Sequence, residues 1–199
     1  EERDGFLRYK VIAAIEKLHR AQPAFAFQRE PIEQLALREA SNYSRYALLH
    51  GSLLENSPSA KDCLLDRAMR EKLVRYLDRT YRILGILYPW KDIQASRWSI
   101  EHGGSRQRAA ALEFIDSLIS GLLRTHLLPI LEETKSEEVL LKRSGLSDNV
   151  PKSLEAVVLQ LIHDVDPLIS ASAIHFARQA MLSSLAQPME DLLATRDAR

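Results

Sequence analysis

A predicted pair of helices that occurs twice is the feature that most constrains the fold of this 199-residue chain. Residues 92–119 resemble residues 154–181 at one constant offset. The aligned positions that carry the likeness are Ala109, Ala111, Leu112, Phe114 and Ile100, which fall on Ala171, Ala173, Ile174, Phe176 and Ile162. Each copy consists of an amphipathic helix, a short break and a second helix rich in small residues. One such pair cannot bury its apolar face alone, so the repeat predicts stacked pairs, that is, an α-solenoid.

The rest of the sequence is also predicted to be helical, because its apolar residues recur with helical spacing and no segment alternates as a strand does. We expect helices over residues 5–20, 31–54, 61–87, 89–102, 106–123, 136–145, 151–163 and 168–185, the fifth continuing to residue 133 with a kink at Pro129. Residues 103–104 are expected to form a turn before an N-cap at Ser105. The predicted fold class is therefore all-α, a solenoid of stacked antiparallel helix pairs, with residues 1–199 as one repeat domain.

Composition excludes several classes of function. Hydrophobic residues make up 46% of the chain, which is ample for a core, and acidic and basic residues balance at 27 each. Neutral charge argues against nucleic acid as a partner, since unspecific binding depends on an excess of Lys and Arg. A single cysteine, Cys63, favours a reducing compartment. No apolar run is long enough for a membrane helix, so this segment is not expected to insert into a bilayer.

Few residues have the spacing of a catalytic or metal site. His163, Asp164 and Asp166 lie close enough in sequence for metal ligation. Structural roles explain them better: Asp164 or Asp166 is expected to cap the next helix, and His163 to end the previous one. Cys63 stands near a helix start, where a reactive thiolate is physically possible, but a small packed residue is the commoner role. No phosphate-binding loop, nucleophile elbow or zinc-binding helix motif occurs. We therefore expect no enzyme activity, no catalytic residue, no cofactor and no metal.

Three arginines and one tryptophan are the candidates for contact with an anion or a partner. Arg75, Arg79 and Arg82 recur at spacings that place them on one helix face, where guanidinium groups are able to grip phosphate or carboxylate. Glu71 and Asp78 lie among them, as they do on an ordinary solvated face. Trp90 follows a proline in a turn and is of the residue type that anchors interfaces. Core packing is the alternative for this tryptophan.

The turns carry a resemblance to the HEAT-repeat family. The resembling segments are Asp166-Pro167 with Ala171, Ala173, Ile174 and Phe176, and Gly104-Ser105-Arg106 with Ala109, Ala111 and Leu112. A longer likeness, over residues 75–119, is to the HEAT segment of bacterial membrane proteins that carry a domain like the ATP:ADP antiporters. This resemblance implies a cytoplasmic module attached to a membrane domain in a longer parent protein. The copies lie further apart than one HEAT unit of about 40–47 residues, so an extra helix or an insertion is expected near residues 129–145.

These observations predict a non-catalytic scaffold that binds a protein or a neighbouring domain. The first predicted helix has no preceding partner in the repeat, which suggests a fragment of a longer protein. A nucleic-acid-binding repeat that uses the arginine stripe, with help from Arg106 and Arg108, is the alternative. An α-helical enzyme acting through His163 or Cys63 has the least support.

Overall fold

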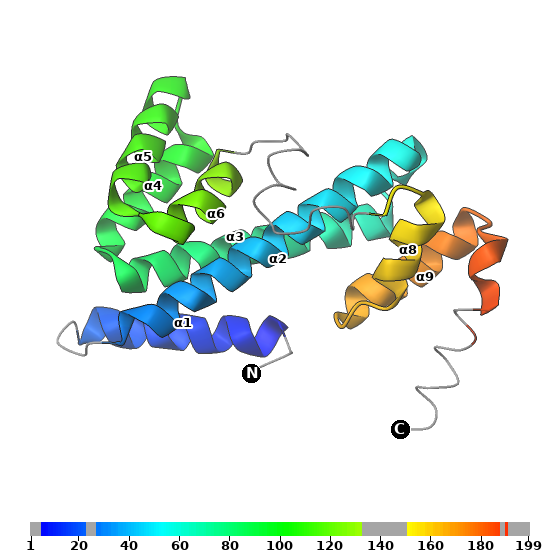
Figure 1. The fold of residues 1–199 in the computed structure, drawn as a ribbon, viewed down its shortest axis with the longest axis horizontal. Helices are drawn as coiled ribbons and strands as arrows, with labels where there is room; N and C mark the ends of the chain where they lie inside the picture. The colour runs from blue at the N-terminus through cyan, green and yellow to red at the C-terminus, as the bar shows by residue number, and fades with distance from the viewer. Residues whose placement is uncertain (1–4, 23–26, 133–150, 188–189, 191–199) are drawn as a thin grey trace. The chain divides into compact units, whose positions relative to one another are not determined.

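The computed structural model describes residues 5–22, 27–132, 151–187 and 190. The prediction of an all-α protein is confirmed, because the described residues form helices joined by turns and contain no strand. The helices are α1 (Gly5–Ala21), α2 (Arg29–Asn56), η1 (Pro58–Ala60), α3 (Leu64–Leu87), α4 (Trp90–His102), α5 (Ser105–Leu118), α6 (Gly121–Leu131), α8 (Leu154–Ile162), α9 (Pro167–Gln179) and η2 (Ser183–Leu185) (Figure 1). The helix expected over residues 136–145 lies outside the described residues.

The described chain divides into two compact units. Unit 1 contains Gly5 and residues 46–73 and 151–187, and unit 2 contains residues 6–22, 27–45 and 74–132. The long helices α2 and α3 are each divided between the two units, with one part of the helix in unit 1 and the other in unit 2. The prediction that residues 1–199 form one repeat domain stays a prediction, as does the stacking of helix pairs into a solenoid.

Unit 2 is built around one apolar cluster to which every helix of the unit contributes. Its buried members are Ile12, Ala36, Ala40, Tyr81, Ile83, Leu84, Ile93, Ile100, Ala111, Ile115, Ile119, Leu123, Leu127, Ile130 and Leu131. Ile12 is the contribution of α1, and the two alanines come from α2. Burial of these side chains is the main favourable term that holds α1 to α6 together.

In unit 1, α8 and α9 pack against each other and η2 packs on α8. The apolar side chains that the two helices bury are Val157, Val158, Leu161, Ile162, Ile169, Ala173, Phe176 and Ala177. Two residues of this unit, Asp62 and Met181, have positive φ values of 63° and 52°. Helix α9 ends at Gln179, before the predicted residue 185, and Met181 with its left-handed backbone follows this end.

The repeated helix pair of the sequence corresponds to α4–α5 in unit 2 and α8–α9 in unit 1, each a helical hairpin (Figure 1). The second helices begin at aligned positions, Ser105 and Pro167. Burial agrees at four of the five aligned pairs: the pairs that begin with Ile100 and Ala111 are buried, the Ala109 pair is exposed and the Leu112 pair is intermediate. Only the phenylalanines differ, since Phe114 is 39% exposed and Phe176 is 6% exposed.

A hydrogen bond across each hairpin is also repeated. In α4–α5, the Nη1 group of Arg108 donates to the carbonyl oxygen of Ile100 at 3.1 Å. At the aligned positions in α8–α9, the hydroxyl of Ser170 donates to the carbonyl oxygen of Ile162 at 2.7 Å. Both bonds satisfy a carbonyl in the last turn of the first helix, which has no partner within that helix. The sequence likeness is thus matched by a shared local structure.

Two predicted details of the hairpins need correction. The N-cap of α5 is Gly104, and Ser105 is the first helical residue. Its neighbour Gly103 is required, because a Cβ there would lie 2.4 Å from the carbonyl oxygen of Ser99. The next helix break falls at residues 119–120, where the backbone is extended, and not at Pro129, which lies inside α6. Gly121 follows this break with φ +56°, a conformation that glycine adopts without steric cost.

The hairpin hydrogen bond is tested by Ser170→Ala, with Ser172→Ala as the control. Both serines are buried on α9, but the hydroxyl of Ser172 has no hydrogen-bond partner within the described chain. Ser170→Ala leaves the buried carbonyl of Ile162 without its donor and is expected to lower the free energy of unfolding by about 1 kcal/mol. Ser172→Ala removes an unsatisfied hydroxyl and is expected to be neutral or stabilising. Urea unfolding of both variants measures the difference, and equal losses would contradict the assignment.

Candidate functional site

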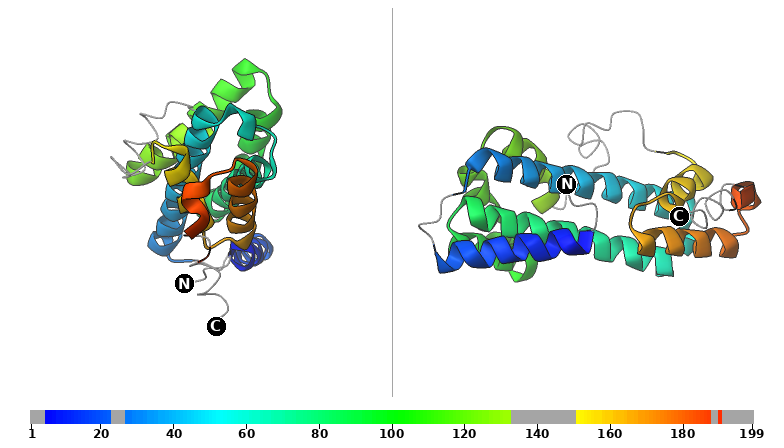
Figure 2. Two further views of the ribbon diagram at one scale, coloured as in Figure 1. Left: turned by 90° about the vertical axis from the view of Figure 1, so that its right-hand side faces the viewer. Right: turned by 90° about the horizontal axis from the view of Figure 1, so that it is seen from below.

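Helix α1 lies at the margin of unit 2 in both views of Figure 2, and its two faces differ in chemistry. The inner face carries Ile12 and Glu16, which are both 2% exposed. The outer face carries Leu7, Val11 and Leu18, which remain 47%, 47% and 44% exposed. The inner face shows how the helix is held, and the outer face is the part that is open to a partner.

Glu39 of α2 is the most deeply buried carboxylate in the network that holds α1. Its side chain is fully buried and accepts a hydrogen bond on each oxygen, from Arg8 of α1 at 3.1 Å and from Arg79 of α3 at 2.7 Å. The guanidinium of Arg79 also lies 4.5 Å from the ring centroid of Tyr76. One carboxylate thus joins three helices, and its charge is balanced by guanidinium groups, as burial of a charge requires.

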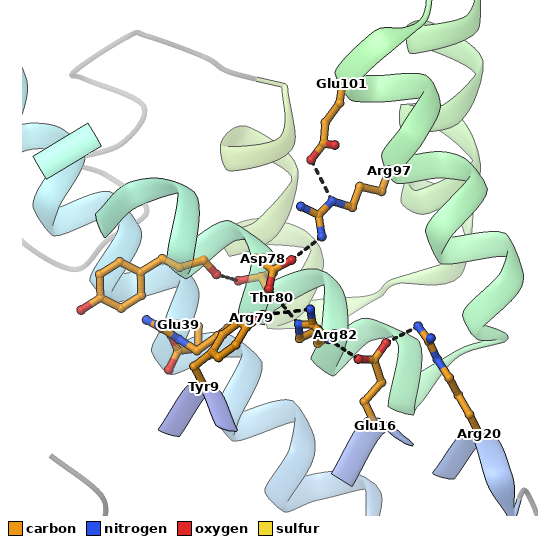
Figure 3. Close-up of polar contacts among 11 residues, drawn as sticks. Tyr9, Glu16, Arg20, Glu39, Asp78, Arg79, Thr80, Arg82, Arg97 and Glu101 are labelled. Carbon is orange, nitrogen blue, oxygen red and sulfur yellow. Dashed lines mark hydrogen bonds and ion pairs between the residues drawn. The ribbon is translucent and has the colours of Figure 1, made fainter. Parts of the chain in front are cut away.

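A second buried carboxylate, Glu16, joins α1 to the far end of α3. It accepts a hydrogen bond from Arg82 of α3 at 2.6 Å and forms an ion pair with Arg20 of its own helix (Figure 3). Arg82 donates further bonds to Asp78 at 2.7 Å and to the hydroxyl of Tyr9 at 3.1 Å. Burial tends to lower the pKa of Arg82, but hydrogen bonds and charge from Asp78 and Glu16 outweigh it and raise the pKa.

The network continues from α3 to α4 through Asp78. This carboxylate accepts from Arg82 and from Arg97 of α4, and Arg97 also donates to Glu101 at 2.8 Å. Partial burial tends to raise the pKa of Asp78, but the hydrogen bonds and charges of the two arginines outweigh it and lower the pKa below its ordinary value of 3.8. Asp78 is therefore a carboxylate whose charged form stabilises the fold.

The predicted arginine stripe is drawn into this network. Arg79 is 3% exposed and bound to Glu39, and Arg82 is shared between Glu16 and Asp78. Arg75, the third member of the stripe, is half-buried on the same helix. The structure thus brings Arg79 and Arg82 together with carboxylates of α1, α2 and α3, so neither presents an unneutralised charge to an anion. Arg108, named with the nucleic-acid alternative, caps α4 instead.

Trp90, the other predicted contact, lies at the start of α4 and is half-buried. The guanidinium of Arg20 lies over its ring at 4.3 Å from the centroid, a cation–π contact between α4 and the last turn of α1. Gly85 packs against Trp90, since a Cβ at this glycine would be 3.6 Å from the Cβ and 3.8 Å from the Cα of the tryptophan. The ring is therefore covered from the side of α1, and it helps to fix that helix.

The outer face of α1 is a narrow apolar stripe. Leu7, Val11, Ala14 and Leu18 recur at alternating intervals of four and three residues, which places them on one line along the helix. All four are exposed. Exposed apolar residues that form such a line, rather than single scattered ones, indicate a binding surface. We call these four residues the α1 seam.

Two lysines border the seam on one side. Lys10 and Lys17 are both exposed and each precedes a seam residue on α1. The only acidic residue of α1 is Glu16, which is buried on the inner face. The outer face of α1 consequently combines an apolar line with a basic border and no carboxylate of its own.

Unit 1 holds a separate polar cluster around Lys72 of α3. The Nζ group of Lys72, which is 6% exposed, lies 3.0 Å from Asp164 and 3.2 Å from Asp166. It also lies 4.3 Å from the ring centroid of Tyr46, whose hydroxyl donates to Asp164. Asp166 accepts from the backbone N–H of Leu168 at 3.0 Å, so the prediction that one of these aspartates caps α9 is confirmed. Within the described ranges, no three His, Cys, Asp or Glu side chains gather as metal ligands do.

The second cluster of unit 1 surrounds Asp66 in the first turn of α3. Asp66 accepts from His50 at 2.6 Å, from the backbone N–H of Asp62 at 2.7 Å and from Arg70 at 2.8 Å. Burial raises its pKa, but these hydrogen bonds and the charges of His50 and Arg70 outweigh it, so the pKa is lowered. The Sγ atom of Cys63 accepts from the N–H of Asp66 at 3.4 Å. The thiol thus occupies the position of a helix cap, a structural role.

The sequence reasoning missed the two buried glutamates, although a signal was present. Glu16 follows the buried Ile12 by four residues, and Glu39 stands between the buried Ala36 and Ala40. A carboxylate in phase with core residues must be paired when it is buried, which predicts an arginine partner. The partner His50 of Asp66 was missed because the two lie on different helices.

Comparison with family models, with curated proteins and with solved structures finds no match for this chain.

None of the helices in the part of the chain that the structure describes is both long and apolar enough to cross a membrane.

The anchoring role of Glu39 is tested by Glu39→Gln, with Asp116→Asn as the control. The amide keeps the size of the side chain but leaves Arg79 buried beside a neutral group, so we expect a loss of about 3–5 kcal/mol in the free energy of unfolding. Asp116 pairs with Arg124 at the surface, and its amide variant is expected to unfold at the same denaturant concentration as the wild type. Denaturant unfolding gives both values. A Glu39→Gln variant as stable as the control would show that the buried pair is not an anchor.

The low pKa of Asp78 predicts a stability that depends on pH. Because the pKa is lower in the folded chain than its ordinary 3.8, the stabilisation is complete above that value and is lost as pH falls through the folded pKa. The wild type should therefore lose more stability than Asp78→Asn between about pH 5 and about pH 3. Thermal or urea unfolding across this range measures the two slopes. Parallel slopes would contradict the assignment.

Proposed function

We propose that this chain is a non-catalytic helical scaffold that binds a protein partner or a neighbouring domain. The observation that carries the proposal is the α1 seam, an exposed apolar line on a helix that two buried carboxylates, Glu16 and Glu39, hold in place. A surface of this kind is preformed, so a partner gains apolar burial there without the cost of ordering the helix. Burial of a line of four apolar side chains is also the usual way in which one helix recognises another.

The polar clusters of unit 1 support a non-catalytic role. Asp166 and Cys63 accept backbone N–H groups at the starts of α9 and α3, and Lys72 is enclosed by Asp164, Asp166 and Tyr46. His50 is held by Asp66, whose carboxylate also binds a backbone N–H and an arginine. These contacts give each group a structural role.

The HEAT resemblance extends the proposal to the parent protein. Two helix hairpins with aligned starts, similar burial and the same cross-hairpin hydrogen bond support a repeat architecture, which serves mostly as a binding scaffold. In a parent of the antiporter-like class, the chain would be a cytoplasmic module that couples the membrane domain to a neighbour. No observation favours the nucleic-acid alternative, since Arg79 and Arg82 are neutralised within unit 2.

Photo-crosslinking from the seam tests the binding function. Benzoylphenylalanine in place of Ala14 should yield a crosslinked species of defined mass in an extract of the source organism, because its side chain would lie in the interface. Leu122 of α6, which is 63% exposed in the same unit, is the matched control position and should yield no such species. Adding Val11→Ser and Leu18→Ser to the Ala14 variant should abolish the product. A product of equal yield at both positions, or one that survives the serine substitutions, would refute binding through the seam.

A further inference from the structure

The α1 seam has the spacing of one side of a coiled coil. Leu7 and Ala14 occupy d positions of a heptad, and Val11 and Leu18 occupy the a positions. In the same register, Lys10 and Lys17 both fall on g positions. In paired helices, the e and g positions face the flanks of the partner and determine which partner is accepted. The seam therefore indicates two properties of a matching partner helix: the spacing of its apolar residues and the charge beside them.

We propose that the α1 seam binds an amphipathic helix of a protein partner that carries glutamate or aspartate beside its apolar line. This inference rests on the proposed binding function and names the partner of the same site. Acidic residues on the flank that meets Lys10 and Lys17 form ion pairs across the interface. The outward side of α1 has no carboxylate of its own that would repel these acidic residues, because Glu16 is turned inward and bound by Arg20 and Arg82. Charge complementarity thus selects an acidic helix.

A second copy of this chain fits the seam less well. In an antiparallel pair the g positions of the two helices face each other, so Lys10 and Lys17 would meet the same lysines of the other copy. Like charges in that position are unfavourable, and this kind of mismatch is how helix pairs reject a wrong partner. A parallel pair of copies would place each lysine opposite an e position, where α1 has Arg8 and Ile15 and offers no carboxylate.

An anionic membrane surface is also a poorer fit. Helices that lie in a membrane interface bury a wide apolar face, which commonly includes tryptophan or phenylalanine. The seam is a single line of aliphatic residues, and the flank beyond it holds Arg8, which is directed to Glu39 inside the unit. A narrow line matches the groove of one facing helix better than it matches a lipid surface.

The test uses the full chain and two synthetic helical peptides, each about three heptads long with leucine at a and d. One peptide carries glutamate at e and g, and the other carries lysine. Fluorescence anisotropy should show the glutamate peptide binding at least about 10-fold more tightly at low salt, with the difference shrinking as salt is added. Lys10→Glu with Lys17→Glu should reverse the preference. Lys61→Glu with Lys152→Glu makes the same change of charge at exposed positions of unit 1, outside α1, and should leave the preference unchanged.

The outcomes separate this inference from the proposed function. Equal binding of the two peptides through Val11 and Leu18 would overturn the acidic partner but keep the apolar docking surface. Absence of binding by both peptides would overturn the inference, and the crosslink from position 14 then decides whether the binding function stands. Sedimentation with phosphatidylserine vesicles through the seam, or self-association lost in Val11→Ser with Leu18→Ser, would replace the acidic helix by a lipid surface or a second copy. Circular dichroism of each variant confirms that the helices are retained.

Discussion

The carboxylate of Glu39 is the group on which the arrangement of unit 2 depends. It is fully buried and has one guanidinium on each oxygen, Arg8 from α1 and Arg79 from α3. A buried ion pair contributes little net stability, since desolvation offsets most of the attraction, but an unpaired one is costly. The pair therefore penalises any packing in which α1 or α3 leaves its place beside α2. Apolar burial holds the unit together, and the carboxylate makes one geometry of α1 better than its alternatives.

Because the arginines of the predicted stripe hold α1 in place, they are not available as a contact surface, and the exposed seam of α1 is the better candidate. A positive stripe on α3 was the natural candidate for a contact surface, but Arg79 and Arg82 are used to hold α1. The apolar line of α1 was not among the predicted contact residues, and it remains exposed. An arginine that is paired with a carboxylate inside the unit does not bind an external anion, whereas exposed apolar surface is able to contact a partner.

The sequence predicted those features that depend on residues near in the chain. Helical spacing located most helices to within a few residues, although it joined α5 and α6 into one helix and extended α9 beyond Gln179. Asp166 was readable as a cap because its acceptor and donor lie two residues apart. Ion pairs at i, i+4, such as Asp78 with Arg82, could be read from spacing alone. The pairing of Glu39 with Arg79 could not, because it depends on how α2 packs against α3. The exposure of the seam could not be predicted for the same reason, because it depends on which other helices pack against α1.

The position of the anchors also determines what binding at the seam would do to the chain. Glu16 and Ile12 lie on the opposite side of α1 from Leu7 and Leu18, so a helix that covers the seam does not compete with the contacts of these two residues. The partner therefore adds to the unit without displacing a part of it. A binding site of this kind favours a constitutive scaffold over a switch, since a ligand shifts an equilibrium only when it binds one of two conformations more tightly. Regulation of such a site would have to come from the partner or from the charge of its lysine border.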